Sequence, residues 1–305
     1  MDNTIQSPFS TNRRAMLLKE IKVQNLIEDY RVQLGIDVSR HFQGLNKFAL
    51  YQCLDTEYRF FYPYNIGGDS KFYENLEKYE WYYMPWKWEH QKIKGQLKGK
   101  EKILEVGSGG LGFLSKMKES GFNVTGLELN KNSLKKAKFL NLELHMETVQ
   151  NFSVRNQEVF DVVCSFQVLE HISQVNSFIK SQLDCLKPSG TLVISVPNNK
   201  SFIRKTEGGI LNKPPHHMGL WDERSLRNLE SIFNLKVEKV FFEPLQKYHY
   251  DWYVNSVLIP FINRNKLLLK IYNKFGSRKI LIRIISVISK YIKGHSILII
   301  YKKND

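Results

Sequence analysis

Apolar and polar positions follow two different rhythms along the chain. From Lys102 onward, short apolar runs alternate with segments of helical spacing, which is typical of a parallel sheet with crossing helices. The apolar runs predict strands over 102–106, 123–128, 141–145, 160–166, 191–196, 236–242 and 296–301. The pattern therefore predicts an α/β fold around a seven-stranded, mostly parallel sheet with helices on both faces.

The first hundred residues have no such alternation. Apolar positions at helical spacing in residues 13–33 predict a leading helix. Between Tyr58 and Trp88, 13 of 31 residues are aromatic, which indicates either a lid packed on the core or a stacking wall for a sugar or another flat substrate. The lid is favoured, because most aromatic side chains are buried in cores. Residues 1–100 are thus expected to form a helical, aromatic-rich extension.

Residues 245–293 interrupt the rhythm again, between the sixth and seventh strands. This segment is helical in pattern, apolar and basic, and it is expected to form a cap inserted into a core made of 101–244 and 294–305. One helical face carries Leu281, Ile284, Ile285, Ile288 and Ile292, and another carries Lys279, Arg283, Ser286 and Lys290. Such a helix packs on its own domain, which is favoured, or docks on an anionic membrane surface.

The cap and the residues after it carry most of the net positive charge of the chain. Of the net charge of +15, +10 lies between Leu245 and the end of the chain, where 12 basic residues face 2 acids. A local basic surface attracts the phosphates of nucleic acid, anionic lipid or a nucleotide-linked substrate. A contact with an anionic membrane surface or a lipid pyrophosphate through 245–293 is therefore expected as one alternative, and nucleic acid is the less expected partner.

The cysteines and the apolar runs indicate the cellular compartment of the protein. Cys53, Cys164 and Cys185 share no CxxC spacing, which speaks against a disulfide framework and a cysteine zinc site. The N-terminal residues have no apolar leader, and no run of eighteen uncharged apolar residues occurs. A cytoplasmic protein is expected, with peripheral attachment to the inner face of the membrane as an alternative.

A glycine-rich turn after the first predicted core strand is the first candidate for chemistry. The segment KILEVGSGGLGFL places Gly107, Gly109, Gly110 and Gly112 where the backbone turns sharply and approaches a ligand under a helix N-terminus. The same glycines satisfy GxGxxG and so also allow a dinucleotide. Glu105 would face the pyrophosphate of NAD unfavourably, whereas it suits the ammonium group of an amino-acid cofactor. Glu128, 19 residues beyond Gly109, is placed to accept bonds from ribose hydroxyls.

The stretch FDVVCSFQVLEHI, followed by LKPSGTLVISVPNN, decides between these cofactors. With it, residues 102–242 resemble the class I S-adenosylmethionine (SAM)-dependent methyltransferases, in the branch with a V-L-E-H motif after the fourth strand. The resemblance implies a Rossmann-like fold and SAM as cofactor. It also implies a SAM pocket made of Glu105, Gly107, Ser108, Gly109, Gly110, Gly112, Glu128, Leu129, Glu147, Phe166 and Gln167. The chain departs from the family at Leu111, where the family has its third glycine.

The upstream motifs YQCLDTEYRFFYP and MPWKWEH are similar to a preamble of bacterial glycan and metabolite O-methyltransferases. This likeness implies that Trp86, Trp88, Glu89 and His90 lie near the mouth of the cofactor site. With His216 and Trp221, the two tryptophans are the expected contacts of the substrate.

Methyl transfer from a sulfonium is an in-line displacement, which requires a positioned nucleophile and a proton acceptor. Candidates are His171 beside Glu170 in the V-L-E-H motif, and His217 in NKPPHHMGLWDERSL. Both segments should open at the carboxyl edge of the sheet, where they could converge. The alternative is structural, with Glu170 and His171 bracing a helix and Trp221 packing a loop.

Three functions stay open. A SAM-dependent O-methyltransferase of a sugar, glycan intermediate or related small metabolite is favoured. A metal-dependent RNA 2′-O-methyltransferase would use Gln167, Glu170, His171 and His217, but Gln167 is a weak ligand for a hard cation, and no metal ligand is assigned. A non-catalytic subunit of a glycan-assembly complex is the third hypothesis.

Overall fold

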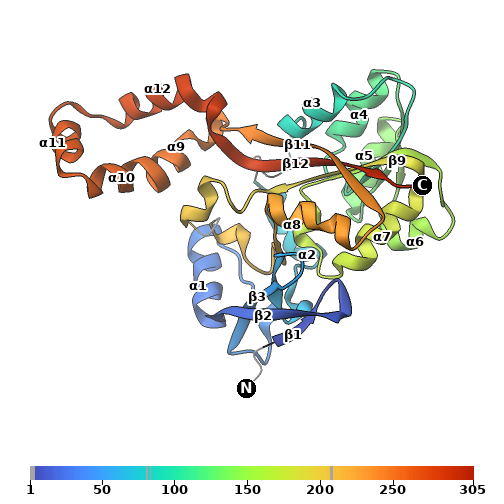
Figure 1. The fold of residues 1–305 in the computed structure, drawn as a ribbon, viewed down its shortest axis with the longest axis horizontal. Coiled ribbons are helices and arrows are strands. Elements are labelled where there is room, and N and C mark those ends of the chain that lie inside the picture. The colour runs from blue at the N-terminus through green and yellow to red at the C-terminus, as the bar shows by residue number, and fades with distance from the viewer. Residues whose placement is uncertain (1–3, 80–81, 83, 207–208) are drawn as a thin grey trace.

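The computed structural model describes residues 4–79, 82, 84–206 and 209–305, with the side chains of 10–13 left undescribed. Trp81 and Tyr83, which belong to the predicted aromatic segment, therefore lie outside the described residues. The chain forms a large sheet, a second sheet from N-terminal residues, and a helical arm that extends away from both (Figure 1).

The large sheet has seven strands in the order β11-β12-β9-β8-β5-β6-β7. The five neighbouring strands β9, β8, β5, β6 and β7 run parallel to one another. β12 pairs antiparallel with both of its neighbours, β11 and β9. The strands are β5 Lys102–Val106, β6 Asn123–Leu127, β7 Glu143–His145, β8 Phe160–Phe166, β9 Leu186–Pro197, β11 Leu235–Pro244 and β12 Lys293–Lys303. All seven strands were predicted, so the α/β, mostly parallel fold is confirmed.

Helices cover both faces of the central strands of this sheet. Successive residues of these strands point to opposite faces and belong to two different apolar clusters. Leu104 and Val163 pack with α6 Val149–Ser153, α7 Val175–Cys185 and α8 Glu223–Arg227. Ile103 and Val162 pack on the other face with α3 Trp88–Lys94, α4 Gly112–Glu119 and α5 Lys131–Phe139. The continuous apolar runs of β5 and β8 thus reflect a sheet that is covered by helices on both sides.

The second sheet corrects the prediction of a leading helix over 13–33. Residues 10–22 form the long strand β2, and helix α1 begins only at Val23. β2 Ser10–Lys22 lies between β1 Thr4–Ser7 and β3 Lys47–Cys53, followed by β4 Arg59–Tyr62 and β10 Gly219–Leu220. A register shift between Leu17 and Lys19 breaks the two-residue period of β2. The bulge therefore hid the strand and left apolar residues at helical spacing.

The aromatic segment joins the two sheets. Tyr58 and Phe60 belong to the same apolar cluster as Leu104 of the large sheet, and the ring of Tyr58 stacks on Trp221 with centroids 4.0 Å apart. Phe61 and Phe72, the latter on α2 Ser70–Leu76, pack instead against α1 Val23–Leu34. Core packing, the favoured of the two predictions for this segment, describes these side chains.

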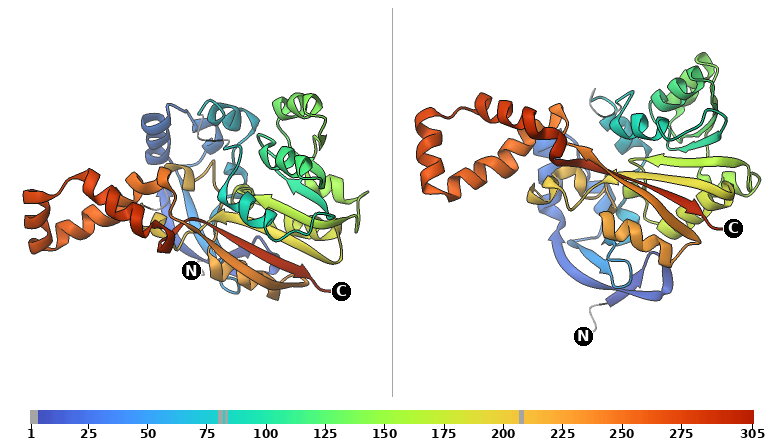
Figure 2. Two further views of the ribbon diagram at one scale, coloured as in Figure 1. Left: turned by 90° about the horizontal axis from the view of Figure 1, so that it is seen from above. Right: turned by 45° about the horizontal axis from the view of Figure 1, so that its top comes forward.

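The residues between β11 and β12 form a helical arm that extends beyond the sheets in every view (Figures 1 and 2). Its helices are α9 Tyr250–Tyr253, α10 Ile259–Arg264, α11 Lys266–Phe275 and α12 Arg278–Ile288. Of the apolar face predicted in α12, Leu281 and Ile285 are buried, whereas Ile284 and Ile288 are exposed. The helix is thus only half covered by its own domain.

Candidate functional site

A cavity of about 1270 Å³ opens at the carboxyl ends of β5, β6, β7, β8 and β9. Loops that follow these strands meet there, as expected for ligand sites in open α/β sheets. Its wall contains every residue predicted for the cofactor, together with both predicted histidine segments. These residues are Glu105, Gly107, Ser108, Gly109, Gly110, Gly112, Glu128, Leu129, Glu147, Phe166, Gln167, Glu170, His171, His216 and His217.

The glycine turn lies where the backbone leaves no room for side chains. The amides of Gly107 and Ser108 donate to the carbonyl of Leu127, at 2.8 and 3.0 Å, which ties the turn to the neighbouring strand β6. Gly107 has φ +80°, and a Cβ atom there would come within 2.5 Å of Val168. A Cβ atom on Gly112 would meet the carbonyl oxygen of Pro85 at 1.8 Å. The turn therefore needs glycine at both positions.

Leu111 shows how the chain accommodates its departure from the family pattern. The residue has φ +66° and ψ +11°, the left-handed conformation that glycine adopts without strain, and it directly precedes α4. Its side chain is fully buried against Phe113 and Met117. The loop thus keeps the backbone path that suits glycine and adds apolar packing.

Glu105 is a buried acid in the wall of the cavity. The side chain is buried, and its Oε2 has no hydrogen-bond partner among the described residues. Burial raises the pKa of Glu105 well above its usual range, and the nearby charge of Glu128 raises the pKa further. A cationic ligand in the cavity would supply the missing partner.

Glu128 organises the next loop. Its Oε2 accepts the amide of Gly109 at 2.7 Å, and its Oε1 accepts the amides of Leu129 and Asn130 at 2.8 and 3.0 Å. Carboxylate oxygens have further lone pairs, so Glu128 can still accept a ligand hydroxyl. Farther along the wall, Glu147 pairs with Arg155.

Phe166 and Gln167 close the floor of the cavity. The ring of Phe166 packs against Phe113 and His90, with centroids 5.0 and 4.9 Å apart. Gln167 has φ +57°, and its Nε2 lies 3.3 Å from Oε1 of Glu89 and 3.2 Å from Oγ of Ser195. Gln167 therefore bridges α3 and β9, an arrangement that commits its amide to the protein.

Three histidines converge as their positions at the sheet edge predicted. The ring centroids of His171 and His216 lie 4.5 Å apart, those of His216 and His217 also 4.5 Å, and those of His171 and His217 4.9 Å. The amide of Met218 donates to the carbonyl of Glu170 at 2.8 Å, which holds the two segments together. Burial lowers the pKa of His171 to about 4 and the pKa values of His216 and His217 well below their usual range. All three rings are thus neutral at physiological pH.

Glu170 adds a second lone carboxylate to this wall. Its side chain is buried, its Oε2 has no hydrogen-bond partner in the described part of the chain, and burial raises the pKa of Glu170 to about 8. Glu105 and Glu170 are therefore two buried acids of one cavity, and Oε2 of each has no hydrogen-bond partner among the described residues.

The three tryptophans predicted as substrate contacts do not line this cavity. Trp221 is completely buried between the sheets, where it stacks on Tyr58. Trp86 stacks on Phe113 and lies beneath the ammonium group of Lys116, 4.7 Å from the ring centroid. Trp88 packs in the apolar cluster beside α3. Trp221 is thus a core residue, whereas Trp86 and Trp88 are half-buried beside α3.

The sequence analysis missed a polar cluster at the root of the arm, which also lines the cavity. Tyr248 donates to Oε1 of Glu243 at 3.2 Å, and Oε2 of Glu243 accepts the amide of Ser296 at 2.9 Å. The rings of His249 and His295 lie 5.2 Å apart. Burial raises the pKa of Glu243 to about 7. Glu243 at the end of β11, where an acid follows an apolar run, was the available signal.

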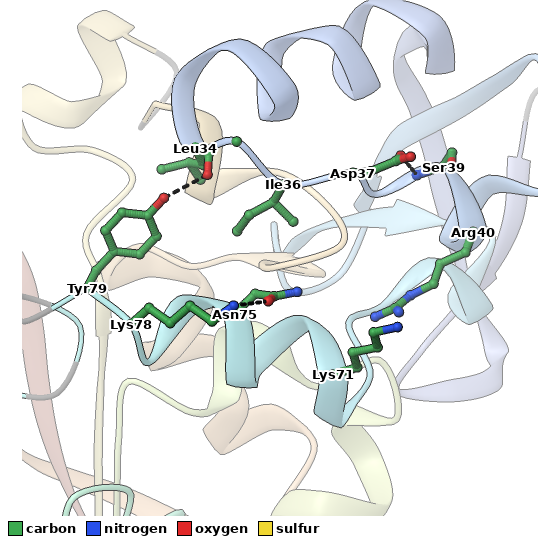
Figure 3. Close-up of a pocket in the computed structure, with 10 residues that line it drawn as sticks. Leu34, Ile36, Asp37, Ser39, Arg40, Lys71, Asn75, Lys78 and Tyr79 are labelled. Atoms are coloured by element: carbon green, nitrogen blue, oxygen red, sulfur yellow. Dashed lines mark hydrogen bonds between the residues drawn. The ribbon is translucent and has the colours of Figure 1, made fainter.

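A second cavity of about 560 Å³ lies between the end of α1 and helix α2 (Figure 3). Tyr79 donates to the carbonyl of Leu34 at 2.7 Å, and Lys78 donates to Asn75 at 2.9 Å. None of the residues predicted for the cofactor or the reaction lines it. The larger cavity is therefore the candidate site.

Comparison with known proteins agrees with this geometry. Residues 82–240 match the sequence model of a family described as "Methyltransferase domain". The ubiquinone biosynthesis O-methyltransferase of Bordetella avium is 33% identical over 122 residues, which cover 37% of this chain and 50% of that protein. The enzyme of the same name from Proteus mirabilis is 33% identical over 126 residues, 38% of this chain and 51% of that protein. The chain thus spans about half the length of the curated relatives it matches.

Solved structures are similar at lower identity. A SAM-dependent methyltransferase from Archaeoglobus fulgidus aligns with a TM-score of 0.49 and 18% identity, over 70% of this chain and 91% of that one. The match to the methyltransferase family spans just over half of the 305 residues. The matched residues include the glycine turn, the acids Glu105 and Glu128, and the V-L-E-H segment. The chain therefore belongs to this family of methyltransferase domains.

Proposed function

We propose that the protein uses SAM to methylate a hydroxyl group of a sugar, a glycan intermediate or a related small metabolite. Methyl transfer and SAM follow from the family to which the chain belongs. The hydroxyl acceptor is supported chiefly by one observation, the convergence of three neutral histidines in the cavity that the glycine turn lines. A neutral imidazole suits the activation of a hydroxyl.

The cofactor is proposed to lie across the glycine turn. Glu105 would face the ammonium group of SAM, because Oε2 of this buried carboxylate has no hydrogen-bond partner among the described residues. Glu128 would accept the ribose hydroxyls while it holds the turn through Gly109. The ring of Phe166 and the loop at Leu129 would border the nucleoside, with Glu147 toward the adenine.

The reaction needs few groups. The acceptor oxygen attacks the methyl carbon in line with the carbon–sulfur bond, whose electrons remain on the sulfur, and the hydroxyl proton leaves. His171 and His217, with Glu170 beside them, are the groups placed to activate this hydroxyl. The polar cluster at the root of the arm would hold the rest of the acceptor, since Glu243, Tyr248 and Trp252 combine hydrogen-bonding groups with a flat ring.

The matched relatives support oxygen as the acceptor atom. By their names, they are O-methyltransferases of ubiquinone biosynthesis. The alternative of a metal-dependent RNA methyltransferase through Gln167 is less favoured, since an amide oxygen is a weak ligand for a hard cation. A non-catalytic subunit is disfavoured by the complete set of glycines and acids.

The decisive experiment measures S-adenosylhomocysteine formation by the full chain with a panel of sugars and nucleotide sugars, each paired with its amino analogue. We expect turnover with hydroxyl acceptors and an O-methyl signal in the product by NMR. Methylation of the amines alone would contradict the hydroxyl assignment. Failure to bind SAM by calorimetry would favour the non-catalytic hypothesis.

The arm supports a second part of the proposal, peripheral attachment to an anionic membrane. No helix in the described ranges is long and apolar enough to span a bilayer. On α11, Leu267, Ile271 and Phe275 lie along one helical face and are exposed to 67%, 49% and 67%. Nine basic residues and no acid occur between Arg264 and Lys293. Apolar side chains beside a basic face fit the interface of an anionic bilayer.

Vesicle sedimentation tests this attachment. We expect the protein to sediment with phosphatidylglycerol vesicles and to remain in solution with phosphatidylcholine vesicles. Binding should weaken at high salt, because salt screens the basic residues. Equal partition in both lipids, or none in either, would overturn it.

A further inference from the structure

The three histidines of the cavity bring one ring nitrogen each into the same small region. One ring nitrogen from each of His171, His216 and His217 lies within 4.8 Å of the other two, so that small side-chain movements would bring all three within bonding distance of a single metal ion. Among the residues that the structure describes, no other group of three histidine, cysteine or acidic side chains meets this condition.

Hydrogen bonds fix which nitrogen of each ring is available. Nδ1 of His171 lies 2.6 Å from the carbonyl oxygen of His216, and Nδ1 of His216 lies 2.8 Å from the carbonyl oxygen of Leu211. Nδ1 of His217 lies 3.1 Å from Oδ1 of Asn212, whose own amide nitrogen donates to Asn199. Because oxygens of this kind only accept, each Nδ1 carries the proton. Each Nε2 therefore carries a lone pair, and the lone pair of His216 is shared with the hydroxyl of Tyr82, which a bound ion would displace.

This pattern is the one that metal-binding histidines use. A histidine ligand almost always donates its second ring nitrogen to a carbonyl or carboxylate, which fixes the tautomer and the ring direction. For His216 there is direct support, since the hydroxyl of Tyr82 lies 3.0 Å from its Nε2 and can donate to it. Three such rings in one place go beyond what the packing of neutral histidines requires.

A second, independent observation points to a cation. Glu170, the residue before His171, lines the same cavity with a buried carboxylate oxygen that has no partner among the described residues. Three imidazole lone pairs gathered without a cation repel one another. A divalent ion would relieve this repulsion.

We propose that Nε2 of His171, His216 and His217 binds a divalent transition metal of the zinc class, with a position left open toward the cavity. Imidazole nitrogens favour Zn²⁺, Co²⁺, Ni²⁺ or Fe²⁺ over Mg²⁺, which prefers oxygen. Three histidines with an open fourth position are typical of catalytic rather than structural zinc sites. Gln167, held by Glu89 and Ser195, is not part of this site.

The use of the metal rests on the proposed function. In the open position, the ion would bind the acceptor hydroxyl and lower its pKa, so that its proton passes to solvent. The alkoxide oxygen then forms a bond to the methyl carbon as the carbon–sulfur bond breaks. The sulfonium becomes the neutral thioether of S-adenosylhomocysteine, and charge and atoms balance.

Cobalt is the probe, since Co²⁺ bound by histidine absorbs visible light. We expect the chelator-stripped full chain to bind one Co²⁺ with visible bands and to lose them when Zn²⁺ is added. His216→Ala and His217→Ala should lower the affinity for Co²⁺ about 100-fold or more, and Asn212→Ala about 10-fold, because Asn212 orients a ligand. His41→Ala, a histidine of the N-terminal part, is the matched control and should bind as the wild type does.

Folding and function are checked separately. Each variant must retain its circular dichroism spectrum and its affinity for SAM. Absence of Co²⁺ bands in the wild type, or equal Co²⁺ affinity in His217→Ala, would overturn the metal site even if methyl transfer proceeds. Co²⁺ binding by the wild type without any methyl transfer would instead contradict the proposed function and leave the metal site standing.

Discussion

Glu105 is the residue at which burial and charge oppose each other most directly. Burial raises its pKa well above the usual range, which favours the protonated form of the side chain in the free protein. The ammonium group of SAM stabilises the ionised form. Binding should therefore release a proton, and the affinity for SAM should rise with pH until Glu105 is ionised in the free protein.

Calorimetry in buffers of different ionisation enthalpy measures this release. We expect the apparent binding enthalpy of the wild type to change with the buffer, and that of Glu105→Gln to change much less. Glu105→Gln should also bind SAM more weakly, by about 1.5 to 3 kcal/mol, the usual contribution of a hydrogen bond to a charged group. An unchanged enthalpy in all buffers would refute the assignment of Glu105.

Leu111 permits a prediction of an unusual order of stability. Glycine there would relieve a left-handed conformation that costs about 1 to 2 kcal/mol, but would lose a buried leucine side chain, whose burial stabilises by about 1.5 to 3 kcal/mol before any cavity forms. Leu111→Gly should therefore lower the free energy of unfolding. Leu111→Ala loses the packing and keeps the strain.

Urea denaturation tests this order. The free energy of unfolding should fall from wild type to Leu111→Gly and again to Leu111→Ala, whereas in an ordinary helix alanine is the more stable of the two. A glycine variant less stable than the alanine variant would show that the left-handed backbone costs little here.

Single residues were predictable where their chemistry demands a position at the sheet edge. Glu105 and Glu128 lie at the ends of predicted strands, the histidines lie in segments that follow predicted strands, and the structure brings all of them into one cavity. Trp221 was mistaken because an aromatic side chain looks alike in sequence whether it binds a ligand or fills a core. Glu243 and His249 were missed because their partners, Ser296 and His295, lie about fifty residues away.

At the scale of elements, α4 and the segment before α3 meet at one glycine. A Cβ atom on Gly112 would overlap the carbonyl oxygen of Pro85, so Gly112→Ala must push residues 84–87 outward. Met84 and Lys87 line the cavity. We expect Gly112→Ala to lower the free energy of unfolding by about 1 to 3 kcal/mol, the usual cost of overpacking, and to weaken SAM binding.

The matched control is Gly95→Ala at the end of α3. A Cβ atom there would find its nearest neighbour at 3.6 Å, an ordinary contact, and the backbone is not left-handed. Thermal unfolding and SAM titration should leave Gly95→Ala close to the wild type. Equal effects of the two substitutions would remove the special role of the contact with Pro85.

Elements were predicted well where one rhythm dominates. The strands of the large sheet lie near the expected positions, because runs buried on both faces are continuous in sequence. The five-stranded sheet was not foreseen. Its strand β2 carries a bulge, and its last strand β10 has only two residues and pairs with β4, far away in the chain. Long-range pairing of this kind leaves little local signal.

At the scale of the whole molecule, the proposed attachment through the arm can be tested separately from the proposed chemistry in the cavity. Replacing Leu267 and Phe275 by serine removes two exposed apolar side chains from α11 and leaves the cavity untouched. We expect this double variant to lose vesicle binding, to keep its affinity for SAM, and to lose activity only toward an acceptor that is presented in a bilayer.

The control for this variant is Val32→Ser combined with Phe139→Ser, two exposed apolar residues on α1 and α5. It should sediment with phosphatidylglycerol vesicles as the wild type does. Loss of sedimentation in both variants would indicate adhesion of apolar side chains in general and not docking through the arm.

The arm leaves the large sheet between two paired strands, with Pro244 opposite Lys293 at its root. Next to this root, Glu243 on one strand and His295 on the other face the cavity. A change in the direction of the arm would therefore displace these two side chains, because only one or two residues separate them from its root. Docking of the arm on a membrane, as proposed, would therefore act one or two residues away from side chains that line the proposed acceptor site.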